Sequence, residues 1–215
     1  MARRSYADRD EPRRRVAAAL HDRLVARVRE AGDLDRLVEL CCGSGLLTLQ
    51  LAESHPDTKI TGLDSSTDHL RKATAAATEL QIIDRVDFER TDLVTLPLPD
   101  ATADLIVGAR ALTRTSNPRV LLSEISRILR PGARAILVDD IPETGHTGSR
   151  RGTLLPSLSR PGTDEETLRT LINTSALKDH IHFARHPYPP DGSFLELTLN
   201  RPVPPKRERT SWRMR

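Results

Sequence analysis

The sequence Leu-Val-Glu-Leu-Cys-Cys-Gly-Ser-Gly, residues 37–45, decides the fold of this 215-residue chain. It joins a short apolar run, which predicts a buried β-strand, to two closely spaced glycines. The next residues, Leu46 to Glu53, have a pattern that predicts a helix, so the glycines lie in a strand-to-helix turn. Glycines in such a turn let a ligand approach the backbone closely.

Glu39 gives this turn its chemical character. A carboxylate at the strand end would repel the pyrophosphate of a dinucleotide, and it suits a cationic group such as an amine or a sulfonium. The glycine spacing also differs from the dinucleotide pattern G-x-G-x-x-G, because Gly43 and Gly45 are followed by Thr48 at the third position. The turn therefore predicts a cationic ligand rather than a dinucleotide.

Strands and helices alternate on both sides of this turn. We expect a disordered segment at 1–10 and helices at 11–30, 46–53, about 65–80, 118 to about 130, and 163–174. We expect strands at 37–42, 59–63, 86–89, 103–109, 133–138, about 180–183 and 194–199. This alternation predicts an α/β fold with a parallel sheet covered on both faces, in which ligands bind beyond the carboxyl ends of the strands.

The composition favours one domain with an aliphatic core, since only 3% of the residues are aromatic. The two cysteines, Cys41 and Cys42, are adjacent, so they predict neither a disulfide framework nor a metal site, and a cytoplasmic location is expected. No signal peptide or membrane span is evident. Most of the 33 basic residues are arginines, which is explained either by a GC-rich coding bias or by binding of anions or nucleic acid.

Residues 38–45 resemble the first motif of the class I S-adenosylmethionine-dependent methyltransferases. That motif has an acid at the position of Glu39 and glycines at the positions of Cys41, Gly43 and Gly45. Cys41 departs from the pattern, because it places a side chain where the family has none. The resemblance implies S-adenosyl-L-methionine as the cofactor and S-adenosyl-L-homocysteine as its product.

Two further acids follow the next two strands. Asp64 lies at the end of the second strand, where a carboxylate can accept hydrogen bonds from both hydroxyls of a ribose. Capping of the next helix is the alternative role for Asp64, although Ser65 and Ser66 are also available as caps. By the same resemblance, Asp92 accepts a hydrogen bond from the adenine amino group and the Leu93 backbone contacts the ring. A surface turn is the alternative explanation for Asp92.

Residues 103–112 and 122–134 resemble the small-molecule, ubiquinone-biosynthesis-like group of these enzymes, and the whole resemblance covers about 37–140 with a weaker continuation to about 200. It implies a Rossmann-like doubly wound sheet of seven mostly parallel strands with an antiparallel C-terminal hairpin. We divide the chain into an N-terminal arm and cap helix (1–32), a methyltransferase domain (33–202) and a basic flexible tail (203–215). The residues expected to bind the cofactor are Glu39, Cys41, Gly43, Ser44, Gly45, Asp64, Ser65, Asp92, Leu93 and Ala109.

The acceptor side is less defined. No Asn-Pro-Pro-aromatic motif follows the fourth strand and no Pro-Cys pair exists, so methylation of nucleic-acid amines or of cytosine carbon is not expected. The catalytic candidates are Arg110, which suits an acidic substrate, and His146, which suits a base or lid residue in the polar stretch 141–162. Further acceptor-side candidates are Thr113, Arg114, Asp139 and Asp140. For the two arginines, surface solvation is the alternative, and His180, His182 and His186 are expected to be structural.

The leading hypothesis is therefore an enzyme that methylates the oxygen, nitrogen or carbon of a small molecule. Three alternatives stay open: a protein of the same fold that binds the cofactor without methyl transfer, an enzyme that uses the bound cofactor electrostatically for another reaction such as a cyclisation, and an RNA-directed methyltransferase that uses the basic tail. No membrane partner is expected, nucleic acid is disfavoured, and the chain is either a monomer or a homodimer.

Overall fold

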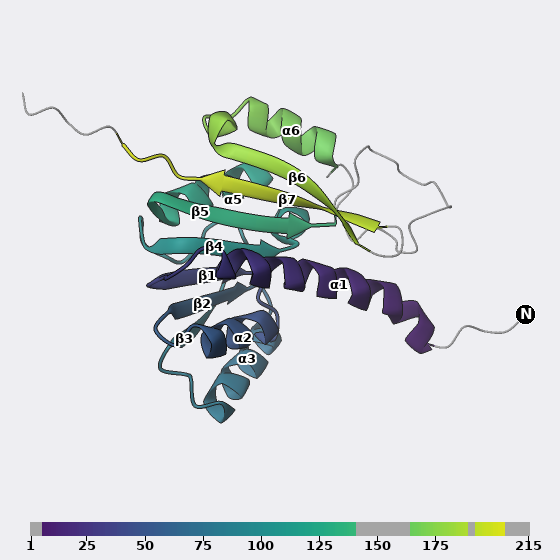
Figure 1. The fold of residues 1–215 in the computed structure, drawn as a ribbon, viewed down its shortest axis with the longest axis vertical. Coiled ribbons are helices and arrows are strands. Elements are labelled where there is room, and N and C mark those ends of the chain that lie inside the picture. The colour runs from purple at the N-terminus through teal and green to yellow at the C-terminus, as the bar shows by residue number, and fades with distance from the viewer. Residues whose placement is uncertain (1–5, 141–163, 189–191, 205–215) are drawn as a thin grey trace, which may run out of the picture.

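A computed structural model describes residues 6–140, 164–188 and 192–204 (Figure 1). Within them lies one sheet of seven strands in the order β3-β2-β1-β4-β5-β7-β6. The strands are β1 Arg36–Leu40, β2 Lys59–Asp64, β3 Val86–Arg90, β4 Ala103–Ala109, β5 Leu129–Asp139, β6 Ile181–Tyr188 and β7 Gly192–Asn200. Strands β1 to β5 pair in parallel and β7 pairs antiparallel with both β5 and β6. The predicted fold class, including its antiparallel hairpin, is confirmed.

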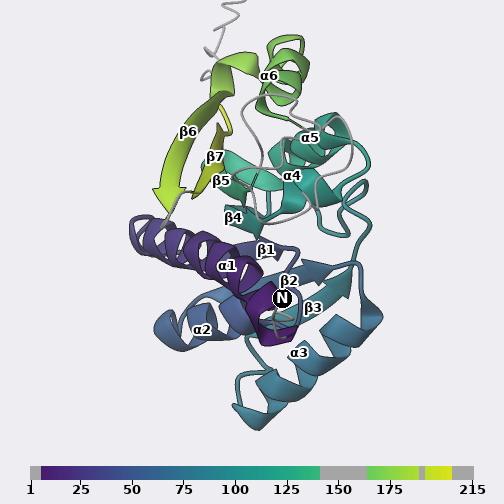
Figure 2. The same cartoon turned by 90° about the vertical axis from the view of Figure 1, so that its right-hand side faces the viewer.

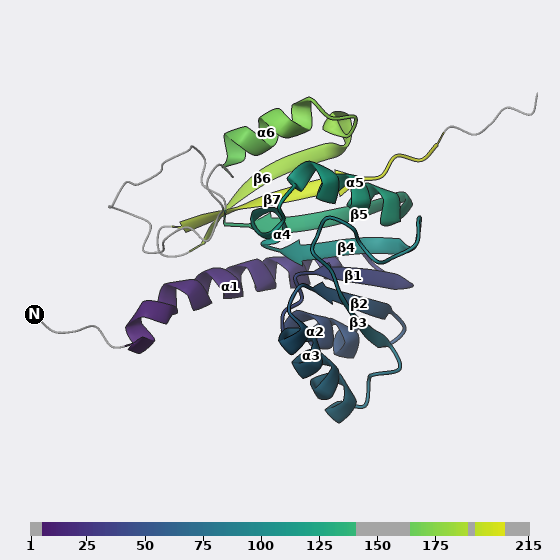
Figure 3. The ribbon, with the colours of Figure 1, turned by 180° about the vertical axis from the view of Figure 1, so that it is seen from behind.

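Helices cover both faces of the sheet (Figures 1, 2 and 3). The first three, α1 Tyr6–Arg29, α2 Leu46–Ser54 and α3 Thr67–Glu79, cover one face. The opposite face carries α4 Ala111–Arg114, α5 Pro118–Ile128 and α6 Glu165–Asn173, and a 3-10 turn at Lys178–His180 precedes β6. None of the helices in the described ranges is long and apolar enough to cross a membrane.

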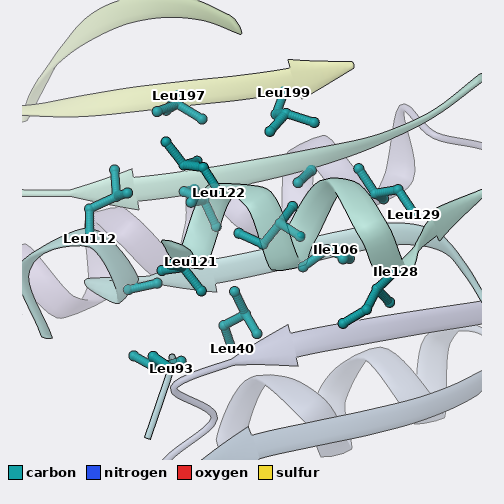
Figure 4. Packing of buried hydrophobic residues seen from close by; sticks show 14 of the residues in the cluster. Leu40, Leu93, Ile106, Leu112, Leu121, Leu122, Ile128, Leu129, Leu197 and Leu199 are labelled. Carbon is teal, nitrogen blue, oxygen red and sulfur yellow. The ribbon is translucent and has the colours of Figure 1, made fainter. Parts of the chain in front are cut away.

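The core is aliphatic, as the composition predicts. On the second face, Leu121 and Leu122 of α5 pack over Leu40 of β1 and Ile106 of β4, and all four side chains are at most 2% exposed (Figure 4). The side chains of β7, such as Leu197, extend this cluster under the antiparallel part of the sheet. The hairpin is therefore part of the same core as the parallel strands.

Helix α1 belongs to the core of the other face. Its residues Val16, Leu20, Leu24 and Val28 repeat every four positions and are at most 2% exposed. They pack with residues of α2, β1, β4 and β5. The N-terminal half of α1 extends past the carboxyl ends of the parallel strands (Figures 1 and 3). This geometry places the helix beside the edge at which ligands of such sheets bind.

Several element boundaries differ from the sequence expectation. The prediction of disorder at 1–10 is wrong from Tyr6 onward, where α1 begins. Strand β5 begins at Leu129 rather than at 133, because Leu129 pairs with Ala103 of β4 ahead of a shift in register. Gly132, with a positive φ of 86°, donates its N–H to Arg201 O. The N-cap of α3 is Ser66, which accepts from His69 N, and the N-cap of α6 is Asp164.

Candidate functional site

The turn after β1 has three residues in the left-handed region: Cys41 (φ 60°), Gly43 (φ 58°) and Gly45 (φ 85°). A Cβ built on Gly43 would meet nothing within 4 Å, so the backbone there borders open space. A Cβ on Gly45 would lie 2.9 Å from the Cβ of Ala73. The two glycines therefore serve different purposes: Gly43 leaves room beside the backbone, and Gly45 lets α3 pack closely against the turn.

Cys41 occupies a backbone conformation that favours glycine, which explains why the family has glycine here. Its side chain is half-buried, and burial raises the pKa of the thiol to about 12. A thiol with such a pKa stays neutral at physiological pH, so Cys41 is not a nucleophile. Its neighbour Cys42 is fully buried, and its sulfur would lie 3.0 Å from a Cβ on Gly62.

Glu39 is a buried carboxyl at the end of β1, with 5% of its surface exposed. It accepts a hydrogen bond from the hydroxyl of Thr48 on α2. Burial raises the pKa of Glu39 to about 7, and the bond from Thr48 opposes this rise. Since no basic side chain in the described ranges pairs with it, a cationic ligand would favour its ionised form.

Asp64 lies at the end of β2 and is 2% exposed. Its Oδ2 accepts from the backbone N–H of Gly43 at 3.0 Å, and its Oδ1 accepts from that of Ser66 at 2.9 Å. The carboxylate thus ties the turn after β1 to the start of α3. The adjacent Ser65 is exposed, as is Ser44 in the turn itself. The ribose-binding role of Asp64 stays a prediction.

Asp92 follows β3 and is exposed. Its Oδ1 accepts from the backbone N–H groups of Val94 at 2.9 Å and Thr95 at 3.2 Å, and these bonds hold the pKa of Asp92 below its usual range. Leu93 has φ 63°, and its N–H already donates to the hydroxyl of Thr91 at 3.0 Å. A contact between the Leu93 N–H and adenine would therefore share or replace that bond.

A pocket of about 150 Å³ lies between the carboxyl ends of β1 and β4 and helix α1. Its polar lining contains Glu39, Cys41 and Cys42 from β1 and its turn, Arg110 and Arg114 from the segment after β4, and His21 from α1. Ala109 also lines it, and the apolar remainder is Ala17, Leu20, Leu24, Leu46 and Leu47. The structure thus brings one group of the predicted residues together, while Asp64 and Asp92 lie outside this pocket at the ends of β2 and β3.

Arg110 and Arg114 lie at the two ends of the short helix α4, which the sequence analysis missed. Arg110 has φ 61°, and its Nε lies 3.4 Å from Asp140 Oδ1, within ion-pair range but without the alignment of a hydrogen bond. Arg114 is exposed; its backbone N–H donates to Arg110 O at 3.1 Å, and among the described residues no hydrogen-bond or ion-pair partner is found for its guanidinium. Arg114 is therefore the guanidinium that is available to a ligand.

Asp139 and Thr113 have a different role from the acceptor-side one expected for them. Asp139 is 0% exposed and accepts from the N–H groups of Leu112 and Thr113 and from the Thr113 hydroxyl at 2.7 Å. Burial raises the pKa of Asp139 to about 7. This carboxyl fixes the start of α4, so Asp139 and Thr113 position the helix that carries the two arginines.

Four of the histidines are compared with the position of the pocket. His146 lies outside the described residues. His182 is exposed, His186 lies 3.5 Å from the buried carboxylate of Glu196, and neither of them lines the pocket. His21, which the sequence analysis missed, lines the pocket and has its Nε2 2.6 Å from Gln50 Oε1 on α2. The only signal for it in the sequence was its position beside Leu20 on the predicted first helix.

Comparisons with known proteins identify the segment that carries these groups. Residues 37–132 match the family model "Methyltransferase domain". A demethylmenaquinone methyltransferase of Lactiplantibacillus plantarum is 36% identical over 104 residues, which are 48% of this chain and 44% of that protein. A 27-O-demethylrifamycin SV methyltransferase of Amycolatopsis mediterranei is 32% identical over 105 residues, covering 49% of this chain and 38% of that protein. The matched part of the chain thus spans less than half the length of either relative.

Solved structures show the same fold at low identity. The [4+2]-cyclase SpnF has a TM-score of 0.66 and 22% identity, covering 85% of this chain and 82% of that one. The geranyl diphosphate C-methyltransferase of Streptomyces coelicolor A3(2), solved with S-adenosyl-L-homocysteine, has a TM-score of 0.69 and 13% identity over 93% of this chain and 86% of that one. Together with the sequence matches, the fold confirms the resemblance drawn from the motifs. Residues 37–132 are therefore similar to the methyltransferase domains of these small-molecule enzymes.

Proposed function

We propose that this protein transfers the methyl group of S-adenosylmethionine to a small-molecule acceptor bound in the pocket beneath α1. The observation that carries the proposal is the shared lining of that pocket: Glu39 and Cys41 of the cofactor turn face the same space as Arg110 and Arg114. A cofactor held at the turn would thus present its reactive end to an acceptor held near α4.

The residues present fit the cofactor. The open backbone at Gly43 is a space that a Cβ would fill, and Glu39 is a buried carboxylate without a basic partner in the described ranges. Glu39 would bind the ammonium group of the methionine part. Asp64 would bind the ribose, because its Oδ2 accepts only the bond from Gly43 N–H and retains a further lone pair, whereas its Oδ1 accepts from Ser66 N–H and lies 3.4 Å from His69 Nδ1. Asp92 would bind adenine through its Oδ2.

When bound, the cofactor supplies a methyl group that is already activated by a sulfonium. The protein then has to hold the acceptor in line and keep water out. Leu20 and Leu24 of α1 and Leu47 of α2 supply an apolar wall on the pocket. This apolar wall would limit the access of water to the methyl group that is transferred.

Calorimetry with S-adenosylmethionine and S-adenosylhomocysteine tests the cofactor part of the proposal. We expect wild type to bind both and Glu39→Ala to lose at least tenfold in affinity, whereas a variant at an exposed acid of α2, Glu53→Ala, binds normally. Absence of binding to either compound by the wild type would refute the proposal.

Mass spectrometry of an acceptor panel tests the transfer. The names of the relatives justify including a reduced naphthoquinone and hydroxylated polyketide-like aromatics. Release of S-adenosylhomocysteine together with an acceptor gain of one methyl group supports the proposal. Cofactor binding without release on any acceptor would favour the second candidate, another reaction that uses the cofactor electrostatically; the solved structure of a [4+2]-cyclase has the same fold.

A further inference from the structure

The pocket beneath α1 contains one group that is suited to accept a proton from a substrate. We propose that His21 takes the proton of a hydroxyl group on the acceptor, so that the protein is an O-methyltransferase for acidic hydroxyl compounds. This inference rests on the proposed methyl transfer and names its substrate class and its base.

The other titratable groups of the pocket are unsuited to this task. Arg110 and Arg114 stay charged, and burial raises the pKa of both thiols, so that Cys41 and Cys42 stay neutral and hold their protons. Glu39 is buried, accepts the bond from Thr48 and is the group that suits the cationic end of the cofactor. Among the described residues that line the pocket, His21 is the remaining side chain with a nitrogen that can accept a proton.

The surroundings of His21 define which ring nitrogen is free. Its Nε2 lies 2.6 Å from Gln50 Oε1, and a carbonyl oxygen only accepts. The proton of the neutral ring is therefore on Nε2, which leaves the lone pair of Nδ1 for a substrate proton. The flanking Leu20 is 1% exposed, so it fixes this turn of α1 against the sheet.

The charges around the pocket favour a hydroxyl over a protonated amine. Arg110 and Arg114 would repel an ammonium group, and they would stabilise the negative charge that develops on an oxygen as it loses its proton. Asp140 lies within ion-pair distance of Arg110, so most of the uncompensated charge belongs to Arg114. A phenolic or enolic hydroxyl is the acceptor that matches a histidine base beside two guanidinium groups.

The step balances without any further reactant. The hydroxyl proton moves to Nδ1 of His21, and an oxygen lone pair forms the new bond to the methyl carbon. The carbon–sulfur bond breaks with its electron pair going to sulfur. The products are a methyl ether, S-adenosylhomocysteine and an imidazolium, and the imidazolium then releases its proton to water.

The test uses His21→Gln with a series of substituted phenols whose pKa values run from about 5 to about 10. At about pH 7.5 the most acidic phenols are already ionised and need no base, so we expect little loss of kcat/KM with them. With the least acidic phenols we expect a loss of about 10²-fold, the usual contribution of a general base. His182→Gln, an exposed histidine on β6, is the matched control and should resemble wild type across the series.

The pH profile gives a second readout. We expect wild-type kcat/KM for a weakly acidic phenol to fall toward acidic pH, where the general base is protonated, and this limb to disappear in His21→Gln and in His21→Asn. An equal loss for all phenols, or an unchanged acid limb, would overturn the role of His21. Methylation of amines or carbon acceptors but of no phenol would overturn the inference while leaving the proposed function intact, and a failure to bind S-adenosylmethionine would instead refute the proposed function.

Discussion

Replacing Gly45 or Gly43 by alanine separates the packing role of the cofactor turn from its binding role. At Gly45 the new Cβ would lie 2.9 Å from the Cβ of Ala73 and 3.3 Å from Cζ of Phe88. At Gly43 it would meet nothing within 4 Å. Both residues have positive φ, so the backbone strain is common to both variants, and the clash belongs to Gly45→Ala alone.

The free energies of unfolding follow from these two contributions. The left-handed backbone costs an alanine roughly 1–2 kcal/mol, and the smaller conformational entropy of alanine in the unfolded chain offsets about 0.4–1 kcal/mol of this. Overpacking adds about 1–3 kcal/mol at Gly45. We therefore expect Gly43→Ala to lose about 1 kcal/mol and Gly45→Ala about 3 kcal/mol.

Urea denaturation of the cofactor-free protein measures these losses, and calorimetry measures affinity for S-adenosylhomocysteine. Gly43→Ala should bind at least tenfold more weakly although it is the more stable variant, because its Cβ fills the space beside the backbone where the cofactor is proposed to lie. If Gly43→Ala binds like wild type, the cofactor does not lie against Gly43. If the two variants are equally stable, the packing argument at Gly45 is wrong.

Three further predictions concern buried charges and thiols. Glu39→Gln should stabilise the cofactor-free protein by up to about 3 kcal/mol at about pH 8 and hardly at all at about pH 4.5. Burial raises the pKa of Glu39 to about 7, so the folded protein loses stability as the pH rises through 7 and the buried carboxyl becomes charged. Equal changes in the free energy of unfolding at both pH values, measured by urea denaturation, would contradict this. Cys41 should resist iodoacetamide at about pH 8 in the native protein and react after unfolding, because its pKa of about 12 leaves little thiolate; rapid modification seen by mass spectrometry would contradict it. Glu196→Ala should lower the free energy of unfolding by about 2 kcal/mol, since it removes the buried ion-pair partner of Arg23 and Arg27 on α1. A loss below about 0.5 kcal/mol in urea denaturation would show that the packing of α1 on the sheet is stable without this carboxylate.

The sequence was sufficient for the sheet because its signals are local. The central strands β1 and β4 contain apolar runs, β2 and β5 end at Asp64 and Asp139, and Asn117 followed by Pro118 marks the start of α5, where Asn117 accepts from Val120 N. The helix α4 was missed because four residues contain no full period of an apolar pattern. Its start depends on Asp139, a residue 26 positions from Thr113 in the sequence, and no local pattern shows such a bond.

The residues of the pocket that were predicted lie in two short segments, the end of β1 with its turn and the segment after β4 that contains Arg110 and Arg114. The first segment includes the turn at 41–45, and the structure places Glu39 and Cys41 on the same pocket. The pocket role of His21 depends on how α1 crosses the ends of β1 and β4, which is a tertiary contact. The same holds for Asp64, whose two bonds to the backbone of Gly43 and Ser66 connect parts of the chain that the sequence separates.

Helix α1 is both a wall of the pocket and a part of the core, and this restricts how an acceptor enters. Undocking the helix would expose Val16, Leu20, Leu24 and Val28, which are at most 2% exposed. At about 2 kcal/mol for each side chain, the undocked state lies about 8 kcal/mol above the docked one and is populated about once in a million molecules. Substrate exchange on a catalytic time scale therefore requires small shifts around a docked α1, and the rate of exchange should not follow the stability of the helix.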